Sequence, residues 1–154
     1  MFRYAVNKSF EEMKSVIIVA ENNLNNNQFK KEVNYRIGTF LHWIFDYYDR
    51  IEKYVGKENI DKHDKKFFSG LRYANNKLKH DSSIIQIYQR TGGSLFPISF
   101  PLYIESIAFR WRFIDKEEDS KYMNQYNNYI SYICEKEIIP ISEQALSSIK
   151  KYEY

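Results

Sequence analysis

The sequence predicts a mostly α-helical protein, an antiparallel bundle of about four to five helices with a small β-hairpin or irregular insert. Apolar residues recur at steps of three and four along most of the 154 residues, which is the helical period. Glycine (5 residues) and proline (3 residues) are scarce, which favours long regular elements over a loop-rich all-β design. The helical period is interrupted over about residues 83–114. We expect a single domain over residues 1–154, a length that buries a sizeable core without disulfide bonds.

The first predicted helix begins at Ser9. Ser9 and Glu12 have the spacing of a capping box, in which a serine at the N-cap is followed three residues later by glutamate. An asparagine-rich run at residues 22–27 predicts the end of this helix and a turn. The apolar stripe of the helix consists of Phe10, Met13, Ile17, Ala20 and Leu24.

The second predicted helix has the clearest apolar period in the chain. No proline interrupts it, and Gly56 is placed to end it. Gly38 lies inside the helix at a cost of about 1 kcal/mol, and we expect it to permit a close helix crossing. The apolar stripe consists of Val33, Ile37, Phe40, Leu41, Ile44, Tyr48, Ile51 and Val55.

A third helix is predicted from about Asp61 to His80. We expect it to pack antiparallel on the second helix, because the connection between the two is short. Its narrow apolar face consists of Phe67, Leu71, Ala74 and Leu78.

Residues 83–114 are predicted to form the β-hairpin or irregular insert. Residues 84–88 are rich in β-formers, residues 91–93 are a turn signal, and Pro97 and Pro101 break up the apolar stretch that follows. Large apolar residues at 107, 109, 111 and 113 alternate with Ala108, Arg110 and Arg112, which predicts a half-buried strand within Ile107–Phe113. A continuing helix is the alternative for this segment.

Helices return at the C-terminal end. Asp119 or Ser120 can cap a helix that carries Tyr122, Tyr126, Tyr129 and Ile133, and we expect Pro140 to kink or end it. A last short helix carries Ile141, Ala145, Leu146 and Ile149.

Cysteine usage and hydropathy predict a cytoplasmic protein with no membrane partner. Cys134 is the only cysteine, so the chain has no internal disulfide framework. Residues 1–10 lack the apolar region of a signal peptide, and the longest apolar run, Val16–Ala20, is far too short to span a membrane. The net charge of +3 is too mild to indicate a polyanionic partner, so the distribution of the charges matters more.

The third helix has a basic polar face that ends in a histidine. Between Lys62 and His80 there are six lysine or arginine residues and one acid, Asp64. On a helical wheel, advancing about 100° per residue, one polar face collects Lys65, Arg72, Asn75, Asn76, Lys79 and His80.

These residue types suit chemistry on RNA. Arginine and lysine stabilise phosphate charge, and asparagine can orient a histidine or bind a phosphate oxygen. Histidine can move a proton on or off a 2′-hydroxyl or a leaving oxygen. Such a helix could act without a metal ion, and no pair of histidines and carboxylates has a convincing metal-ligand spacing. No phosphate-cradling loop is present either, so we expect no cofactor. The alternative is that this face is simply solvated.

The segment Gly70–Asp81 resembles the conserved helix of HEPN-domain proteins. Many HEPN proteins carry an arginine, a polar residue that is often asparagine, three further residues and a histidine. In that register Asn76 takes the polar position and His80 the histidine. The resemblance implies a HEPN-like helical bundle of toxin–antitoxin or phage-defence type, in which the arginine and histidine of two subunits meet at a homodimer interface and cut RNA without metal. It also implies an antitoxin-like protein as a partner.

The chain departs from the HEPN pattern at the arginine. The resemblance places the arginine at position 75, where this chain has Asn75. Arg72 lies almost one turn earlier on nearly the same face, displaced by about 4.5 Å along the axis. Three outcomes follow: a slow ribonuclease, a ribonuclease that uses Arg72, or a non-catalytic relative.

Three functions therefore compete. The first is a metal-independent endoribonuclease in which His80 is the general acid/base, Asn76 its partner and Arg72 the phosphate clamp. The second is a non-catalytic HEPN-like module that binds nucleic acid, a nucleotide or a protein partner. The third is a structural helical protein whose basic face is idle.

Two further groups of residues are weaker candidates. Arg110 and Arg112 alternate with aromatic residues, a pattern that suits single-stranded nucleic acid, with Lys65, Asn75 and Lys79 as further contacts. The alternative is an amphipathic strand with its aromatics in the core. His42, beside Trp43, is interpreted as a packed or ion-paired histidine, with a second catalytic role as the alternative.

Overall fold

The computed structural model describes residues 1–23, 27–90 and 107–153. In these ranges it has five α-helices and one two-stranded antiparallel sheet, so the predicted mostly-α bundle with a small β-hairpin is confirmed. The helices are α1 (Phe2–Glu21), α2 (Asn27–Val55), α3 (Lys62–Leu78), α4 (Met123–Tyr132) and α5 (Ile138–Lys150). The strands are β1 (Ile85–Gln89) and β2 (Ile107–Trp111), and three short 3₁₀ helices are η1 (Lys57–Asn59), η2 (Ser82–Ile84) and η3 (Ser120–Tyr122).

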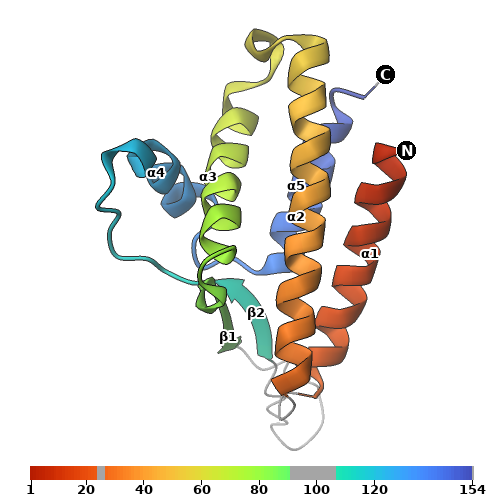
Figure 1. The fold of residues 1–154 in the computed structure, drawn as a ribbon, viewed down its shortest axis with the longest axis vertical. Helices are drawn as coiled ribbons and strands as arrows, with labels where there is room; N and C mark the ends of the chain where they lie inside the picture. The colour runs from red at the N-terminus through yellow and green to blue at the C-terminus, as the bar shows by residue number, and fades with distance from the viewer. Residues whose placement is uncertain (24–26, 91–106, 154) are drawn as a thin grey trace, which may run out of the picture.

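The long helix α2 forms the centre of the bundle. Figure 1 shows α1 on one side of α2, α3 on the other and α5 behind it, with α4 on the far side of α3. The two strands lie at the end of the bundle where α3 finishes. Their register pairs Ile85 with Trp111 and Gln89 with Ile107. Within the described ranges, no helix combines the length and the apolar character needed to cross a membrane.

Helix α1 begins seven residues earlier than predicted, at Phe2 rather than Ser9. The prediction from the capping box is wrong because the apolar stripe continues N-terminal to Phe10: Val6, one turn earlier, is 1% exposed. Ser9 instead lies inside the helix, where its hydroxyl donates to the carbonyl of Val6 at 3.0 Å. Burial of Val6 therefore decides where the helix starts.

Helix α2 ends as predicted, at Gly56, whose φ of +87° suits glycine. The expectation of a close helix crossing at Gly38 is wrong. A Cβ built on Gly38 would have no described atom within 4 Å.

The close crossing is at Gly70, where α3 meets α4. A Cβ on Gly70 would lie 2.7 Å from the backbone carbonyl of Asn128 and 2.8 Å from the nitrogen of Tyr129. The Asn128 side chain donates to the hydroxyl of Ser69 at 3.0 Å across the same contact. Helix α3 is thus drawn against α4, and the helix surface around Gly38 is left open.

Helix α3 starts as predicted but ends two residues before His80. Asp61 is the N-cap, and its side chain accepts hydrogen bonds from the backbone nitrogens of His63 (2.8 Å) and Asp64 (3.2 Å). The last helical residue is Leu78, and His80 lies in the turn that follows, with its backbone nitrogen donating to the carbonyl of Lys77. The histidine is therefore carried by a turn rather than by the helix.

The strand predicted within Ile107–Phe113 is confirmed as β2, and the helical alternative is wrong. Burial does not strictly alternate, because Ala108 is buried as well as Phe109 and Trp111. The predicted turn at 91–93, Pro97 and Pro101 lie outside the described residues.

Pro140 neither kinks nor ends the preceding helix. Helix α4 already ends at Tyr132, and Glu135 takes a φ of +59° in the turn between the helices. Pro140 is instead the third residue of α5, where no intrahelical N–H is needed.

Candidate functional site

The C-terminal end of α3 has two hollows, one on either side. The first, here called the α2 hollow, has a volume of about 410 Å³ and the second, the α4 hollow, about 470 Å³. Lys79 lines both. The α2 hollow is lined by Asn34, Tyr35, Gly38, Thr39 and His42 of α2 and by Asn75, Leu78, Lys79 and Ser82. The α4 hollow is lined by Tyr73, Asn76, Lys77, Lys79, His80 and Tyr122.

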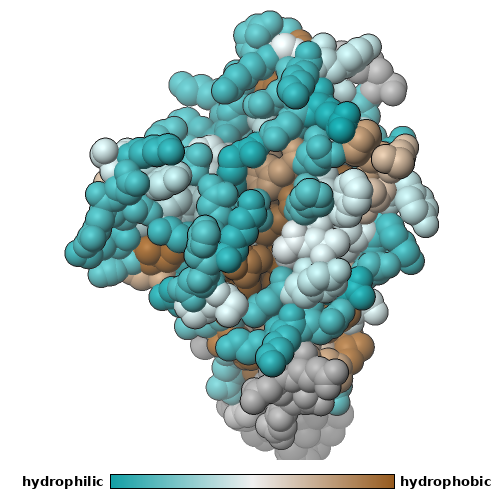
Figure 2. All heavy atoms as spheres, in the orientation of Figure 1, coloured by the Kyte–Doolittle hydropathy of each residue, from teal (hydrophilic) through white to brown (hydrophobic). Residues whose placement is uncertain are grey.

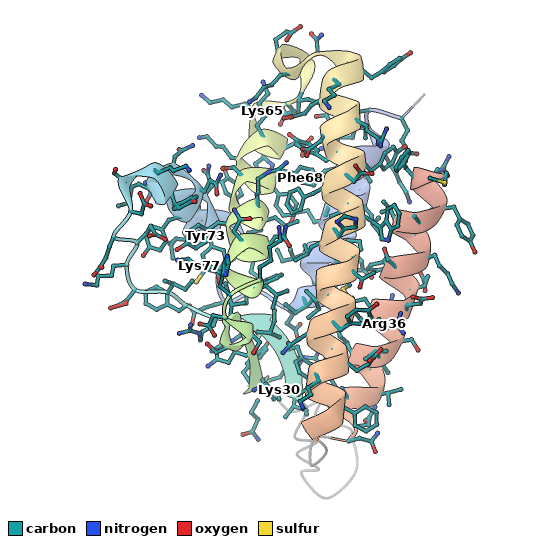
Figure 3. All side chains as sticks on the ribbon, viewed as in Figure 1. Lys30, Arg36, Lys65, Phe68, Tyr73 and Lys77 are labelled. Carbon is teal, nitrogen blue, oxygen red and sulfur yellow. The ribbon has the colours of Figure 1, made fainter. Side chains whose placement is uncertain are left out.

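The packing of α3 divides its polar face between these hollows. Asn75 lines the α2 hollow, whereas Asn76 and His80 line the α4 hollow. Figure 3 shows Tyr73 and Lys77 on the α4 side of α3, and Phe68 pointing toward α2. On the face drawn in Figure 2, apolar surface is visible in the groove between α2 and α3.

His80 and Lys79 are exposed at the end of α3. Neither side chain has a hydrogen bond or an ion pair with any residue in the described ranges. A cation at this position is stabilised by the negative end of the helix dipole. Both side chains are therefore available to a ligand, with Asn76 in the same hollow as His80.

The turn that carries His80 is held by Asp81 and Arg112. The Asp81 carboxylate accepts a hydrogen bond from the backbone nitrogen of Ser83 at 2.8 Å. It also forms an ion pair with Arg112, whose Nη2 atom lies 3.4 Å from Oδ2. Arg112 also donates from Nε to the carbonyl of Ser83 at 3.0 Å. Hydrogen bonds from Ser83, with a smaller contribution from Arg112, hold the pKa of Asp81 below its usual range. Arg112, predicted as a nucleic-acid contact, thus anchors the turn.

One wall of the α4 hollow is built on Glu117. The hydroxyl of Tyr73 donates to Oε2 of Glu117 at 2.6 Å, and Lys77 Nζ lies 3.0 Å from the same oxygen. The backbone nitrogen of Asp119 donates to Oε1 at 3.0 Å. The hydrogen bond from Tyr73, aided by those from Asp119 and Lys77, lowers the pKa of Glu117 to about 2. Since Glu117 neutralises Lys77, Lys79 is the lysine of this hollow without an ion pair to a described residue.

Arg72 lies in neither hollow. Its Nη2 atom is 2.5 Å from Oδ1 of Asp49 on α2, and its guanidinium carbon is 4.5 Å from the centre of the Phe45 ring. Along the helix axis it is about 10 Å from Lys79. The predicted phosphate clamp is therefore paired with a carboxylate and separated from His80.

Lys65 and Arg110 also lie apart from the two hollows. Lys65 is near the start of α3, about 20 Å along the axis from Lys79, and Figure 3 shows it at the opposite end of the helix from Lys77. Arg110 donates to the side-chain oxygen of Gln86 at 3.0 Å and lies 4.4 Å from the centre of the Tyr88 ring.

Apart from His42, which was a weaker candidate, the site residues contributed by α2 and η3 were not predicted from the sequence. Asn34, Gly38 and His42 recur at four-residue steps on α2, a polar and small stripe that could have signalled one wall of the α2 hollow. Tyr122 was assigned to the helical core, and no local signal places it beside His80.

One group of three residues in the described ranges has ligand atoms close enough together for a metal ion. The group is Asp61, His63 and Asp64, with these atoms all within 4.8 Å. Asp61 caps α3, and the Asp64 carboxylate accepts from Lys151 (3.1 and 3.2 Å) and Tyr152 (2.7 Å). The carboxylates of this group therefore already stabilise the start of α3 and the end of the chain.

No family model, curated protein or solved structure matches the chain. The functional argument therefore depends on the two hollows and the side chains between them.

Proposed function

We propose that this chain is a HEPN-like protein that binds RNA at the C-terminal end of α3. The observation that carries the proposal is the pair Lys79 and His80, both exposed, adjacent, and without a side-chain partner in the described part of the chain. An ammonium group without an ion pair is suited to a phosphate, and the neighbouring imidazole and the Asn76 amide add hydrogen-bonding groups. The resemblance of Gly70–Asp81 to the HEPN helix supports RNA as the polyanion.

Metal-independent cleavage of RNA is the second candidate function. His80 is free to act as a general acid/base, which favours it. Against it, position 75 is Asn75, and the guanidinium of Arg72 is paired with Asp49. Cleavage would require a second cation, either from the other subunit of a homodimer or from release of Arg72. Binding without cleavage, to RNA or to an antitoxin-like partner, requires neither.

The first experiment is incubation of a mixed RNA pool with the protein in EDTA, with binding and new RNA ends measured in the same samples. We expect Lys79→Ala and His80→Ala to weaken binding. Lys65→Ala and His63→Ala are matched controls, because they remove a partly exposed lysine and an exposed histidine at the other end of α3.

New ends that carry 2′,3′-cyclic phosphate, present with the wild type and absent with His80→Ala, would establish the ribonuclease. Binding without new ends would establish the non-catalytic module. The proposal is wrong if the wild-type protein binds no RNA at low salt, or if the site variants bind no more weakly than the controls.

A further inference from the structure

We infer that the α2 hollow holds an unpaired RNA base, with the adjoining phosphate at Lys79 and the next nucleotide in the α4 hollow. The ligand is then single-stranded RNA rather than a duplex. This inference rests on the proposed function and adds to it the class of RNA and a second contact surface on α2.

The position of Lys79 is the first argument. Its side chain lines both hollows, so a phosphate bound by Lys79 has a hollow on either side of it. Each hollow, at about 410 and 470 Å³, lies in the size range of small-ligand sites. No acidic residue among the described residues lines the α2 hollow. At the α4 hollow, the charge of Glu117 is paired with Lys77, whose Nζ lies 3.0 Å from the carboxylate.

The lining of the α2 hollow suits a nucleobase, which has apolar faces and polar edges. Gly38 presents bare helix backbone, with no described atom within 4 Å of the position of a Cβ, and Leu78 adds apolar surface. Tyr35 is 64% exposed at the same hollow and offers an aromatic face. The Oδ1 atom of Asn34 is buried and accepts no hydrogen bond from a described residue. The amide of Asn75 lies across from α2 and can reach the other edge of a base.

The α4 hollow offers a second place to stack a base. Tyr122 is its partly exposed aromatic residue, whereas Tyr73 is only 2% exposed and forms a wall of the hollow, held by Glu117. Bases stack on aromatic side chains with little dependence on sequence. Bases in a duplex are paired and stacked inside the helix, so only an unpaired strand can place one base in each hollow.

The test compares Gly38→Leu with the wild type. A Cβ at this position meets no described atom within 4 Å, so the leucine side chain can project into the α2 hollow and occupy part of it. The substitution also replaces glycine, the poorest helix former after proline. The variant should therefore fold, with a Tm raised by about 2–4 °C. A loss of binding in this variant cannot then be ascribed to unfolding.

Binding is measured by fluorescence anisotropy in EDTA with a labelled single-stranded RNA of about twelve nucleotides and with its blunt duplex. We expect the wild type to prefer the single strand. Gly38→Leu should weaken single-strand binding about tenfold, the effect of losing one stacked base, and leave duplex binding unchanged. Lys79→Ala should weaken both.

The outcomes separate the two proposals. Normal single-strand binding by Gly38→Leu, together with a loss in Lys79→Ala, overturns the inference and leaves the proposed function standing. Absence of RNA binding by the wild type overturns the proposed function itself. If light scattering shows that Gly38→Leu changes the mass of the particle, the hollow is a contact between two copies of the chain and the inference is wrong.

Discussion

Arg72 on α3 is paired with Asp49 on α2, with Nη2 of the arginine 2.5 Å from Oδ1 of the aspartate. Both side chains are partly exposed, so the pair contributes at most about 1 kcal/mol to stability. Its larger consequence is electrostatic, because it neutralises the arginine closest to Asn75, the position where the proposed resemblance to HEPN proteins would place an arginine.

We predict that Asp49→Asn strengthens RNA binding. The variant keeps the shape of the side chain and releases the guanidinium, which can then reach a phosphate of a bound strand. The slope of log affinity against log salt should steepen by about 0.7, the value for one added phosphate contact with a single strand. The control is Asp46→Asn, which removes the neighbouring α2 carboxylate that pairs with Arg50 at 3.4 Å. Equal effects of the two variants would mean that only net charge had changed.

Arg112 is predicted to act on RNA binding through the turn that carries His80. Arg112→Gln removes the contacts to Asp81 and Ser83, so the turn loses its anchor and affinity for RNA should fall a few-fold. The salt slope should not change, because no phosphate contact is lost. Arg110→Gln, two residues earlier in β2, is the control. A slope that falls by about 0.7 in Arg112→Gln would instead identify a direct phosphate contact.

The two helical glycines are predicted to respond to alanine in opposite directions. Gly70→Ala places a Cβ 2.7 Å from the backbone of Asn128, which cannot move without shifting α4, so the free energy of unfolding should fall by about 1–3 kcal/mol. Gly38→Ala meets no described atom and gains helix propensity, so the free energy of unfolding should rise by about 1 kcal/mol.

Thermal unfolding of the two variants checks this pair, at about 2–4 °C in Tm for each 1 kcal/mol. Stabilisation by Gly70→Ala would contradict the close contact between α3 and α4.

Glu117 is predicted to contribute stability that depends on pH. Its pKa in the folded protein, about 2, is below the usual value of about 4.3, so the folded state binds its proton less readily than the unfolded state. The contribution is therefore complete above about pH 4.3 and is lost as the pH falls through about 2.

Glu117→Gln should accordingly lower the free energy of unfolding by about 1–2 kcal/mol at pH 7, with the difference from wild type shrinking in acid. Urea unfolding at several pH values measures it. Glu118→Gln, which alters an exposed neighbour, should change little at any pH. A Glu117→Gln effect that is constant from pH 7 to 3 would show that the ionised carboxylate is not what matters.

Local signals in the sequence were sufficient for most of the helices and for the strand. The apolar stripe from Val33 to Val55 and the stop at Gly56 are properties of one segment, and they predicted α2 correctly. The start of α1 was mispredicted because the capping pattern at Ser9 is local, whereas the helix is extended by burial of Val6 in the core.

The candidate site could be predicted only in part. The end of α3 with Lys79 and His80 was visible as a basic helix ending in histidine. The placement of Asn75 and Asn76 in different hollows could not be predicted. The helical wheel gives angles around one helix and contains no information about the neighbouring helices. The pairing of Arg72 with Asp49 likewise depends on where α2 lies.

The sequence by itself determined the helical class of this protein and the polar, basic character of α3, because both follow from residue spacing within single segments. Only the tertiary structure decided that α3 crosses α4 closely at Gly70 and leaves Gly38 open beside α2. A glycine permits close approach wherever it occurs, but the approach happens only where a second helix, here one far along the chain, brings its backbone to meet it.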